Sequence, residues 1–129
     1  MQSAELWLFK MRKVKNKKII CFDIDNTLCF TKKNYYNRAK PNLKAIEALN
    51  ELYSQGYYIK LFTSRFMGRN KENAIKAKKQ GYNFTKKQLK KWNVRHDKLI
   101  LGKPSYDVLV DDKCIFYKKN WYELIKKKI

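Results

Sequence analysis

The sequence has few of the residues on which several common kinds of site depend. It contains three cysteines and one histidine in 129 residues. Cys21, Cys29 and Cys114 are far apart and form no C-x-x-C or Cys/His spacing, which argues against a disulfide framework and a structural zinc site. A histidine-based triad or a multi-histidine metal centre would depend on His96 alone, so we expect neither.

Long apolar runs are also absent. No run approaches the roughly 18 residues that a membrane-spanning helix needs. The apolar patch at residues 6–9 is too short for the core of a signal peptide, and no small-residue cleavage site follows it. We therefore expect a soluble, cytoplasmic protein with no membrane partner.

Acidic residues are scarce as well. The sequence has 11 acidic and 31 basic residues, which gives a formal net charge of +20. Such a field attracts nucleic acid, an anionic membrane face or a phosphorylated metabolite. All but five of the basic residues are lysines. Because bidentate readout favours arginine, this composition argues against sequence-specific nucleic-acid recognition without excluding nucleic acid as a partner. A lysine-rich solvated surface would explain the charge equally well.

The length and the 44% hydrophobic content predict one folded domain. We assign residues 1–16 to an N-terminal extension and residues 17–129 to the domain. Met11 could be an internal translation start, or the apolar patch of the extension could pack on the domain or on a partner subunit.

Apolar periodicity predicts strands that alternate with helices. We expect a loop or small flap at residues 26–40 and strands at 18–24, 57–62, 98–101 and 107–110. We expect helices at 41–56, at 71–79, from Thr85 through Trp92, and from Trp121 to the lysines at 126–128. In this reading Pro41 opens the first helix, and Gly81 ends the second. Such alternation predicts an α/β fold, a single Rossmann-like three-layer domain with a mainly parallel central sheet.

Two carboxylates lie where the first predicted strand ends. Asp23 and Asp25 stand two residues apart, and the period of an extended chain makes them neighbours on one side. At the carboxyl end of a parallel strand, a divalent cation shared with a phosphate would compensate two close anions. Solvated aspartates at a strand-to-loop junction would explain these residues without any chemistry.

Polar side chains follow the other predicted strands at the same end. Thr63 and Ser64 follow the second strand, Lys103 follows the third, and Asp111 and Asp112 end the fourth. One parallel sheet would gather them around the carboxylates of the first strand. The set then contains a nucleophile, an acid/base, a hydroxyl donor, a cation and a metal carboxylate, as phosphoryl transfer requires.

This order of motifs resembles the haloacid dehalogenase superfamily, with D-x-D-x-T, a Ser/Thr, a Lys and an acidic pair matched from about residue 18 to 113. Asp25 favours its phosphatase branch, because the dehalogenases lack an acid there. A narrower resemblance, to small phosphatases of bacterial capsule-polysaccharide biosynthesis, is carried by four segments, Lys40-Pro41, Thr63-Ser64-Arg65, Gly102-Lys103-Pro104 and Val110-Asp111-Asp112.

The resemblance implies a role for each residue. Asp23 would attack phosphorus and form an aspartyl-phosphate, while Asp25 would protonate the leaving oxygen and then activate water. Thr63 would donate to a phosphoryl oxygen. Lys103 would offset the negative charge around Asp23 and the phosphate.

The resemblance also implies Mg²⁺, held by the Asp23 side chain, the Asp25 backbone carbonyl, the Asp111 side chain and waters. Such partial hydration suits magnesium. Adjacent residues at a strand end point in opposite directions, so only one of the acidic pair readily faces the metal. We assign that place to Asp111 and let Asp112 orient a metal-bound water, with the reverse assignment left open.

The spacing of the motifs leaves no room for a cap domain, so we expect an uncapped site. Arg65 directly follows the second motif and, with Ser64, is expected to bind substrate, although solvated loop residues would look the same. We expect a phosphomonoester hydrolase for a small phosphorylated sugar, polyol or amino alcohol of surface-polysaccharide biosynthesis. An open site also admits large substrates unless neighbouring subunits of a homo-oligomer cover it.

Two other functions fit the sequence. One is a phosphatase of nucleic-acid ends or of phosphoprotein, which the open site and the positive charge favour. The other is a non-catalytic basic binding module, although a module has no need for all five catalytic positions. Salt separates the enzymatic alternatives, because polyanion binding weakens steeply with ionic strength.

Overall fold

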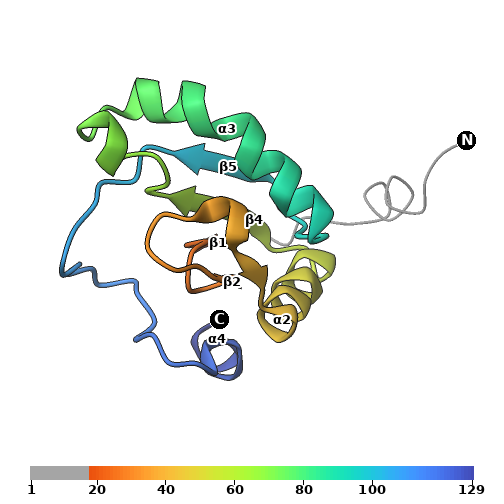
Figure 1. Ribbon diagram of the computed structural model, residues 1–129. Coiled ribbons are helices and arrows are strands. Elements are labelled where there is room, and N and C mark those ends of the chain that lie inside the picture. Colours follow the sequence, from red (N-terminus) through yellow and green to blue (C-terminus); the bar gives the residue numbers. More distant parts are fainter. Residues whose placement is uncertain (1–17) are drawn as a thin grey trace, which may run out of the picture.

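The central sheet consists of three parallel strands in the computed structural model, which describes residues 18–129. β1 (Ile19–Phe22), β4 (Tyr58–Thr63) and β5 (Lys98–Leu101) lie side by side in the order β1-β4-β5 (Figure 1). The middle strand alternates half-buried and fully buried residues, with Ile59 and Leu61 inaccessible to solvent. Because all three strands run the same way, their carboxyl ends meet at one edge of the sheet.

A small hairpin occupies most of the segment that we expected to be a loop or flap. β2 (Cys29–Phe30) pairs antiparallel with β3 (Lys40–Pro41), and the short 3-10 helix η1 (Tyr36–Arg38) lies between them. The hairpin starts four residues after Asp25. It carries η1 to the loop that follows β4, where the Tyr36 ring packs against Phe66.

The first helix, α2 (Leu43–Ser54), begins two residues later than predicted. Pro41 lies in β3, and Asn42 caps the helix by accepting a hydrogen bond from the Ala45 amide at 3.2 Å. Asparagine satisfies an orphan amide of the first turn, which Pro41 cannot do. Gly56, at a φ of 95°, follows the helix, as predicted.

The next helix, α3 (Ala74–Lys91), is one element where the sequence predicted two. Gly81, predicted to end a helix, and Thr85, predicted to start one, both lie inside α3 and are buried. A Cβ atom built on Gly81 would clash with the Phe66 ring. The glycine is therefore explained by the close approach of Phe66 and not by a helix end.

The strand predicted at residues 107–110 is absent, and within residues 18–129 no fourth strand joins the sheet. Residues 102–120 form neither helix nor strand and run along the outside of the molecule to α4 (Trp121–Lys128) (Figure 1). Val108 and Val110 are 78% and 94% exposed. Their β-branched pattern predicted a strand, but in the structure this segment pairs with no other strand.

Trp121 anchors α4 to the sheet. Its ring lies 5.2 Å from that of Phe22, and its Nε1 donates to the backbone oxygen of Thr27 at 3.2 Å. α4 also contacts α2, and Figure 1 shows both on the side of the molecule away from α3. The main core cluster lies among the three strands, α2 and α4, and α3 adds Leu89 to it from the other side.

The fold class is confirmed as α/β with a parallel sheet and helices. The predicted extension at residues 1–16 lies outside the described residues. Among residues 18–129, none of the helices combines the length and the apolar character that crossing a membrane demands.

Gly81→Ala should lower the free energy of unfolding by about 1–2 kcal/mol. The new methyl group overpacks the contact with Phe66, and the better helix propensity of alanine offsets only part of that cost. Phe66 has little room to retreat, because its ring already packs on Tyr36 and Phe84. Urea unfolding followed by circular dichroism measures the change. Gly68→Ala is the control and should be close to neutral, because no atom lies within 4 Å of the added Cβ; equal effects would contradict the packing argument.

Candidate active site

Asp23 and Lys103 form an ion pair at the carboxyl edge of the sheet. Lys103 Nζ lies 3.6 Å from Asp23 Oδ1, and the two residues follow β1 and β5 respectively. The Lys103 amide also donates to the backbone oxygen of Thr63 at 3.2 Å, which ties the loop after β5 to the end of β4. The structure thus brings three of the predicted site residues to one edge.

The Asp23 carboxylate lies between protein and solvent. Its side chain is 37% exposed, yet the surrounding chain still removes part of its hydration, and this burial raises its pKa. The charge of Lys103 and the Ile24 amide act in the opposite direction. Burial alone would lower the pKa of Lys103, but Asp23 and Tyr106 outweigh it and raise that pKa, so Lys103 is cationic at neutral pH.

Asp25 is held by partners on both of its oxygens. Arg65 Nε donates to Oδ2 at 2.9 Å, and Arg65 NH2 donates to Oδ1 at 2.9 Å. The hydroxyl of Thr31 donates to Oδ1 at 2.6 Å. This is a bidentate pair reinforced by a short hydrogen bond, a geometry that fixes the carboxylate firmly.

Arg65 has a different place from the substrate-binding one predicted for it. It is only 1% exposed, and its NH1 donates to Gln88 Oε1 at 2.6 Å. Its guanidinium lies 4.9 Å from the centre of the Tyr36 ring, and Gln88 in turn donates to the Tyr36 backbone oxygen. Arg65 is therefore a positioning residue for Asp25, and no sequence motif links its partners Gln88 and Tyr36 to it.

The hydroxyl groups of the second motif differ in exposure. Thr63 is buried at 1% exposure, and its Oγ1 accepts a hydrogen bond from the Arg65 amide at 3.1 Å. Ser64 is half-buried. The chain then turns back at Phe66, whose φ of 68° lies in the left-handed region that bulky residues rarely adopt. Thr63 thus stands at the strand end expected for it, next to the Lys103 loop.

Asp111 and Asp112 do not join the other predicted metal ligands. Both are exposed in the long segment before α4, and Asp111 Oδ1 accepts from the Lys113 amide at 2.8 Å. That hydrogen bond is the main reason why the pKa of Asp111 is lowered. In the part of the chain that the structure describes, no three His, Cys, Asp or Glu side chains cluster in a way that could hold a metal. The predicted set of Asp23, Asp25 and Asp111 is not assembled, because residues 107–110 form no strand that would deliver Asp111.

A cavity of about 680 Å³ lies elsewhere in the molecule. It opens between α2 and α4 and is lined by residues such as Glu47, Glu51 and Tyr122. None of the predicted site residues lines it. The candidate active site is therefore the strand edge around Asp23 and not this cavity.

Comparisons with known proteins support the fold. A scan against protein-family models finds no match, and neither does a search of curated proteins. The chain is similar to a structural-genomics target from Vibrio cholerae whose crystal structure is known, with a TM-score of 0.72 and 25% sequence identity. The likeness covers 87% of this chain and 98% of that one, and the name of that protein states no activity. It supports the α/β architecture over nearly the whole described chain.

Arg65→Met should reduce the free energy of unfolding by on the order of 3 kcal/mol, because it leaves the Asp25 carboxylate without its charged partner. Arg65→Lys should recover only part of this loss, since lysine cannot form the two parallel hydrogen bonds. Urea unfolding provides the measurement. Arg69→Met is the matched control. Arg69 also follows β4, but it is exposed, and its guanidinium stacks on the Phe66 ring. Its loss should cost below about 1 kcal/mol; similar costs at both positions would contradict the pairing role of Arg65.

Proposed function

We propose that this protein is a phosphomonoester hydrolase in which Asp23 forms a transient aspartyl-phosphate. The observation that carries the proposal is the pairing of a solvent-accessible carboxylate with a lysine, 3.6 Å apart, at the carboxyl edge of a parallel sheet. Asp23 can be approached from solvent, and Lys103 offsets the charge that a phosphate would bring. A haloacid dehalogenase-like, uncapped fold is part of the same proposal.

The chemistry proceeds in two displacements at phosphorus. In the first, an Asp23 oxygen bonds to phosphorus while the ester P–O bond breaks and the leaving oxygen takes up a proton. In the second, water attacks the aspartyl-phosphate, gives up a proton, and releases inorganic phosphate and the free carboxylate. Lys103 remains beside the reacting oxygens throughout, and Thr63 is the proposed donor to a phosphoryl oxygen.

Asp25 is the proposed acid in the first displacement and the base in the second. Both of its oxygens contact Arg65, and one of them also accepts from Thr31. Proton transfer therefore requires Asp25 to exchange at least one of these partners for the leaving oxygen or water. The roles of Arg65 and Asp25 are linked in this way, because either oxygen of Asp25 must give up a hydrogen bond from the guanidinium before it can turn toward substrate.

A magnesium ion is also part of the proposal, although the described arrangement does not collect its three predicted ligands. Within residues 18–129, β1 pairs only with β4 and its other edge carries no strand, and Ile19 on that strand is 56% exposed. Pairing of residues 107–110 along this edge, parallel to β1, would cover Val108 and Val110. Asp111 would then leave the sheet at the edge where Asp23 lies. When bound, Mg²⁺ would offset the charge shared by Asp23 and the phosphate.

The proposed substrate is a small phosphorylated sugar, polyol or amino alcohol. No second domain covers the strand edge within residues 18–129, and Asp23 stays accessible. The link to capsule or surface-polysaccharide biosynthesis rests on the short segments that resemble phosphatases of that pathway. A phosphate-release screen over several dozen phosphorylated metabolites, with Mg²⁺ present, would identify the substrate.

Asp23→Asn should reduce phosphate release to below a few per cent of the wild-type rate, because the amide is not a competent nucleophile. The screen above supplies the assay, and acid quenching of the wild-type reaction should trap one phosphoryl group on the protein. Circular dichroism checks that the variant is folded. Glu47→Gln, which removes an exposed carboxylate from α2, should leave the rate unchanged. Substantial turnover by the Asp23 variant would refute the covalent mechanism.

Removal of Mg²⁺ by EDTA should stop turnover, and Mg²⁺ should restore it while Ca²⁺ inhibits, since calcium tolerates looser geometries. Full activity in EDTA would remove the metal from the reaction.

Asp111→Asn should weaken Mg²⁺ binding, measured by calorimetry without substrate, more than Asp112→Asn does. Val110→Asp should also weaken it by opposing the pairing of residues 107–110 with β1. Phe116→Asp, at another highly exposed apolar position outside that segment, should not.

A further inference from the structure

The outward face of α3 carries a dense row of lysines. All seven lysines of the helix are exposed, and no acidic residue occurs between Glu72 and Asp97. At 3.6 residues per turn, six of the seven fall within an arc of about 140° opposite the buried residues. We call these six the α3 lysine face: Lys76, Lys79, Lys86, Lys87, Lys90 and Lys91.

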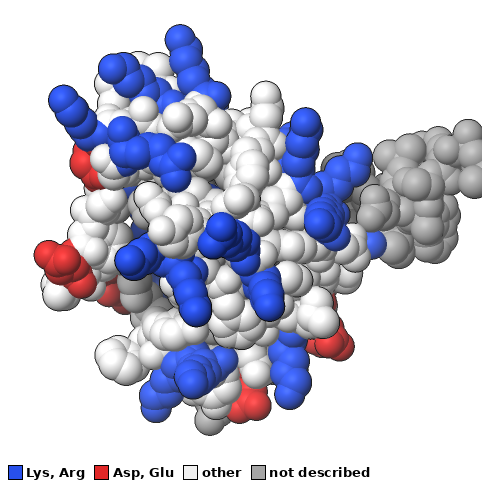
Figure 2. Space-filling view, viewed as in Figure 1, with Lys and Arg blue, Asp and Glu red and all other residues white. Residues whose placement is uncertain are grey.

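The distribution of charge over the molecule is uneven. The exposed acids of the helices lie on α2 and α4, at Glu47, Glu51 and Glu123. Figure 2 shows basic side chains over most of the visible face, including the part where α3 lies, and fewer acidic side chains toward its edges. Among the helices of residues 18–129, α3 thus carries exposed lysines without any acidic residue.

The α3 lysine face is unfavourable for the isolated helix. Like charges three or four residues apart repel one another, as in the pairs Lys86–Lys90 and Lys87–Lys91, and no acid on α3 relieves them. Packing of Ala77 and Leu89, both fully buried, holds the helix in place. A bound polyanion would offset this repulsion directly.

The shape of the face fits an extended phosphate chain. From Lys76 to Lys91 the helix rises about 22 Å, at 1.5 Å per residue, so the lysines form a track and not a single pocket. Lysine is a point charge suited to phosphate contacts that carry no sequence information. The absence of arginine from α3, which argues against base-specific readout, therefore does not argue against backbone binding.

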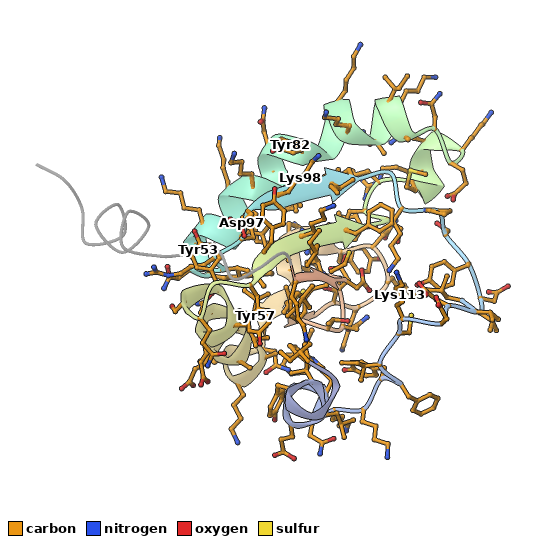
Figure 3. All side chains as sticks on the ribbon, turned by 180° about the vertical axis from the view of Figure 1, so that it is seen from behind. Tyr53, Tyr57, Tyr82, Asp97, Lys98 and Lys113 are labelled. Atoms are coloured by element: carbon orange, nitrogen blue, oxygen red, sulfur yellow. The ribbon has the colours of Figure 1, made fainter. Side chains whose placement is uncertain are left out.

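An aromatic ring lies within the same helix. Tyr82 is half-buried, and its ring centre lies 6.0 Å from Lys78 Nζ and 5.7 Å from Lys86 Nζ. Figure 3 labels Tyr82 on α3 and the exposed Lys98 at the start of β5, which packs against α3. Aromatic rings set among cations stack unpaired bases. A membrane surface fits less well, because α3 exposes only two large apolar side chains, Ile75 and Phe84, and its other apolar residues pack in the domain.

We propose that the α3 lysine face binds the phosphate backbone of single-stranded nucleic acid without sequence preference. This binding is separate from the proposed hydrolase activity, because none of its residues belongs to the strand edge around Asp23. The two proposals can therefore fail independently.

Fluorescence anisotropy of a labelled oligonucleotide of about 20 nucleotides, as DNA and as RNA, tests the proposal with the full chain. Binding should be measurable at about 50 mM salt, and the logarithm of the binding constant should fall linearly with the logarithm of the salt concentration. Replacing Lys76, Lys79, Lys87 and Lys90 together by Gln should lower the affinity at least tenfold and reduce the salt slope by about 3, at about 0.7 per lost phosphate contact. Tyr82→Leu should weaken binding without changing the slope.

The matched control replaces four exposed lysines elsewhere by Gln, namely Lys44, Lys113, Lys118 and Lys119. It removes the same charge and should retain most of the affinity and slope. Urea unfolding should show the α3 variant to be at least as stable as the wild type, because glutamine is a good helix former and repulsion is reduced. The proposal is overturned by equal losses in both variants, by no binding at about 50 mM salt, or by α3-dependent binding to phosphatidylserine vesicles in preference to the oligonucleotide.

Discussion

A buried guanidinium is tolerated only when its charge is paired, and this constraint organises the carboxyl edge of the sheet. Arg65 is 1% exposed, and its cation is paired with Asp25. Through Gln88 and the Tyr36 backbone, the same side chain connects the loop after β4 to α3 and η1. The loop after β4, the segment after β1, η1 and α3 are thus connected through the guanidinium of Arg65. Asp25 is fixed by this network, whereas Asp23 faces outward toward Lys103 and solvent.

The sheet and part of the site could be predicted because both follow from local patterns and chain order. Apolar runs without a helical period gave β1, β4 and β5 within a few residues of their observed bounds. Alternation with helices then implied parallel strands, and parallel strands bring their carboxyl ends together. That reasoning needs no knowledge of side-chain packing. It is sufficient to place Asp23, Thr63 and Lys103 at one edge.

The parts that could not be predicted depend on contacts between distant residues. Gly81 resembles a helix stop, but it lies within α3 because the Phe66 ring occupies the space of a side chain. Arg65 follows a polar motif and resembles a substrate ligand, yet its partners Asp25 and Gln88 are 40 and 23 residues away. Residues 107–110 have the composition of a strand, but composition alone does not pair a segment with the edge of another strand. Each pattern was compatible with two structures that differ only in tertiary contacts.

The positive charges of the molecule act on an anion at long range and at short range, and only the short-range charge affects a bond formed at Asp23. At about 0.15 M salt the Debye length is about 8 Å, so exposed lysines farther away than this change the arrival of an anion and hardly affect a bond at Asp23. Lys103, at 3.6 Å and partly shielded from water, is within the range where a charge changes the stability of a reacting carboxylate. The lysines of α3 act on the arrival and binding of an anion, since their effect on a ligand depends on many weak contacts along a surface. A change in salt concentration therefore affects these two parts of the same field differently, and the net charge alone does not determine what the protein does.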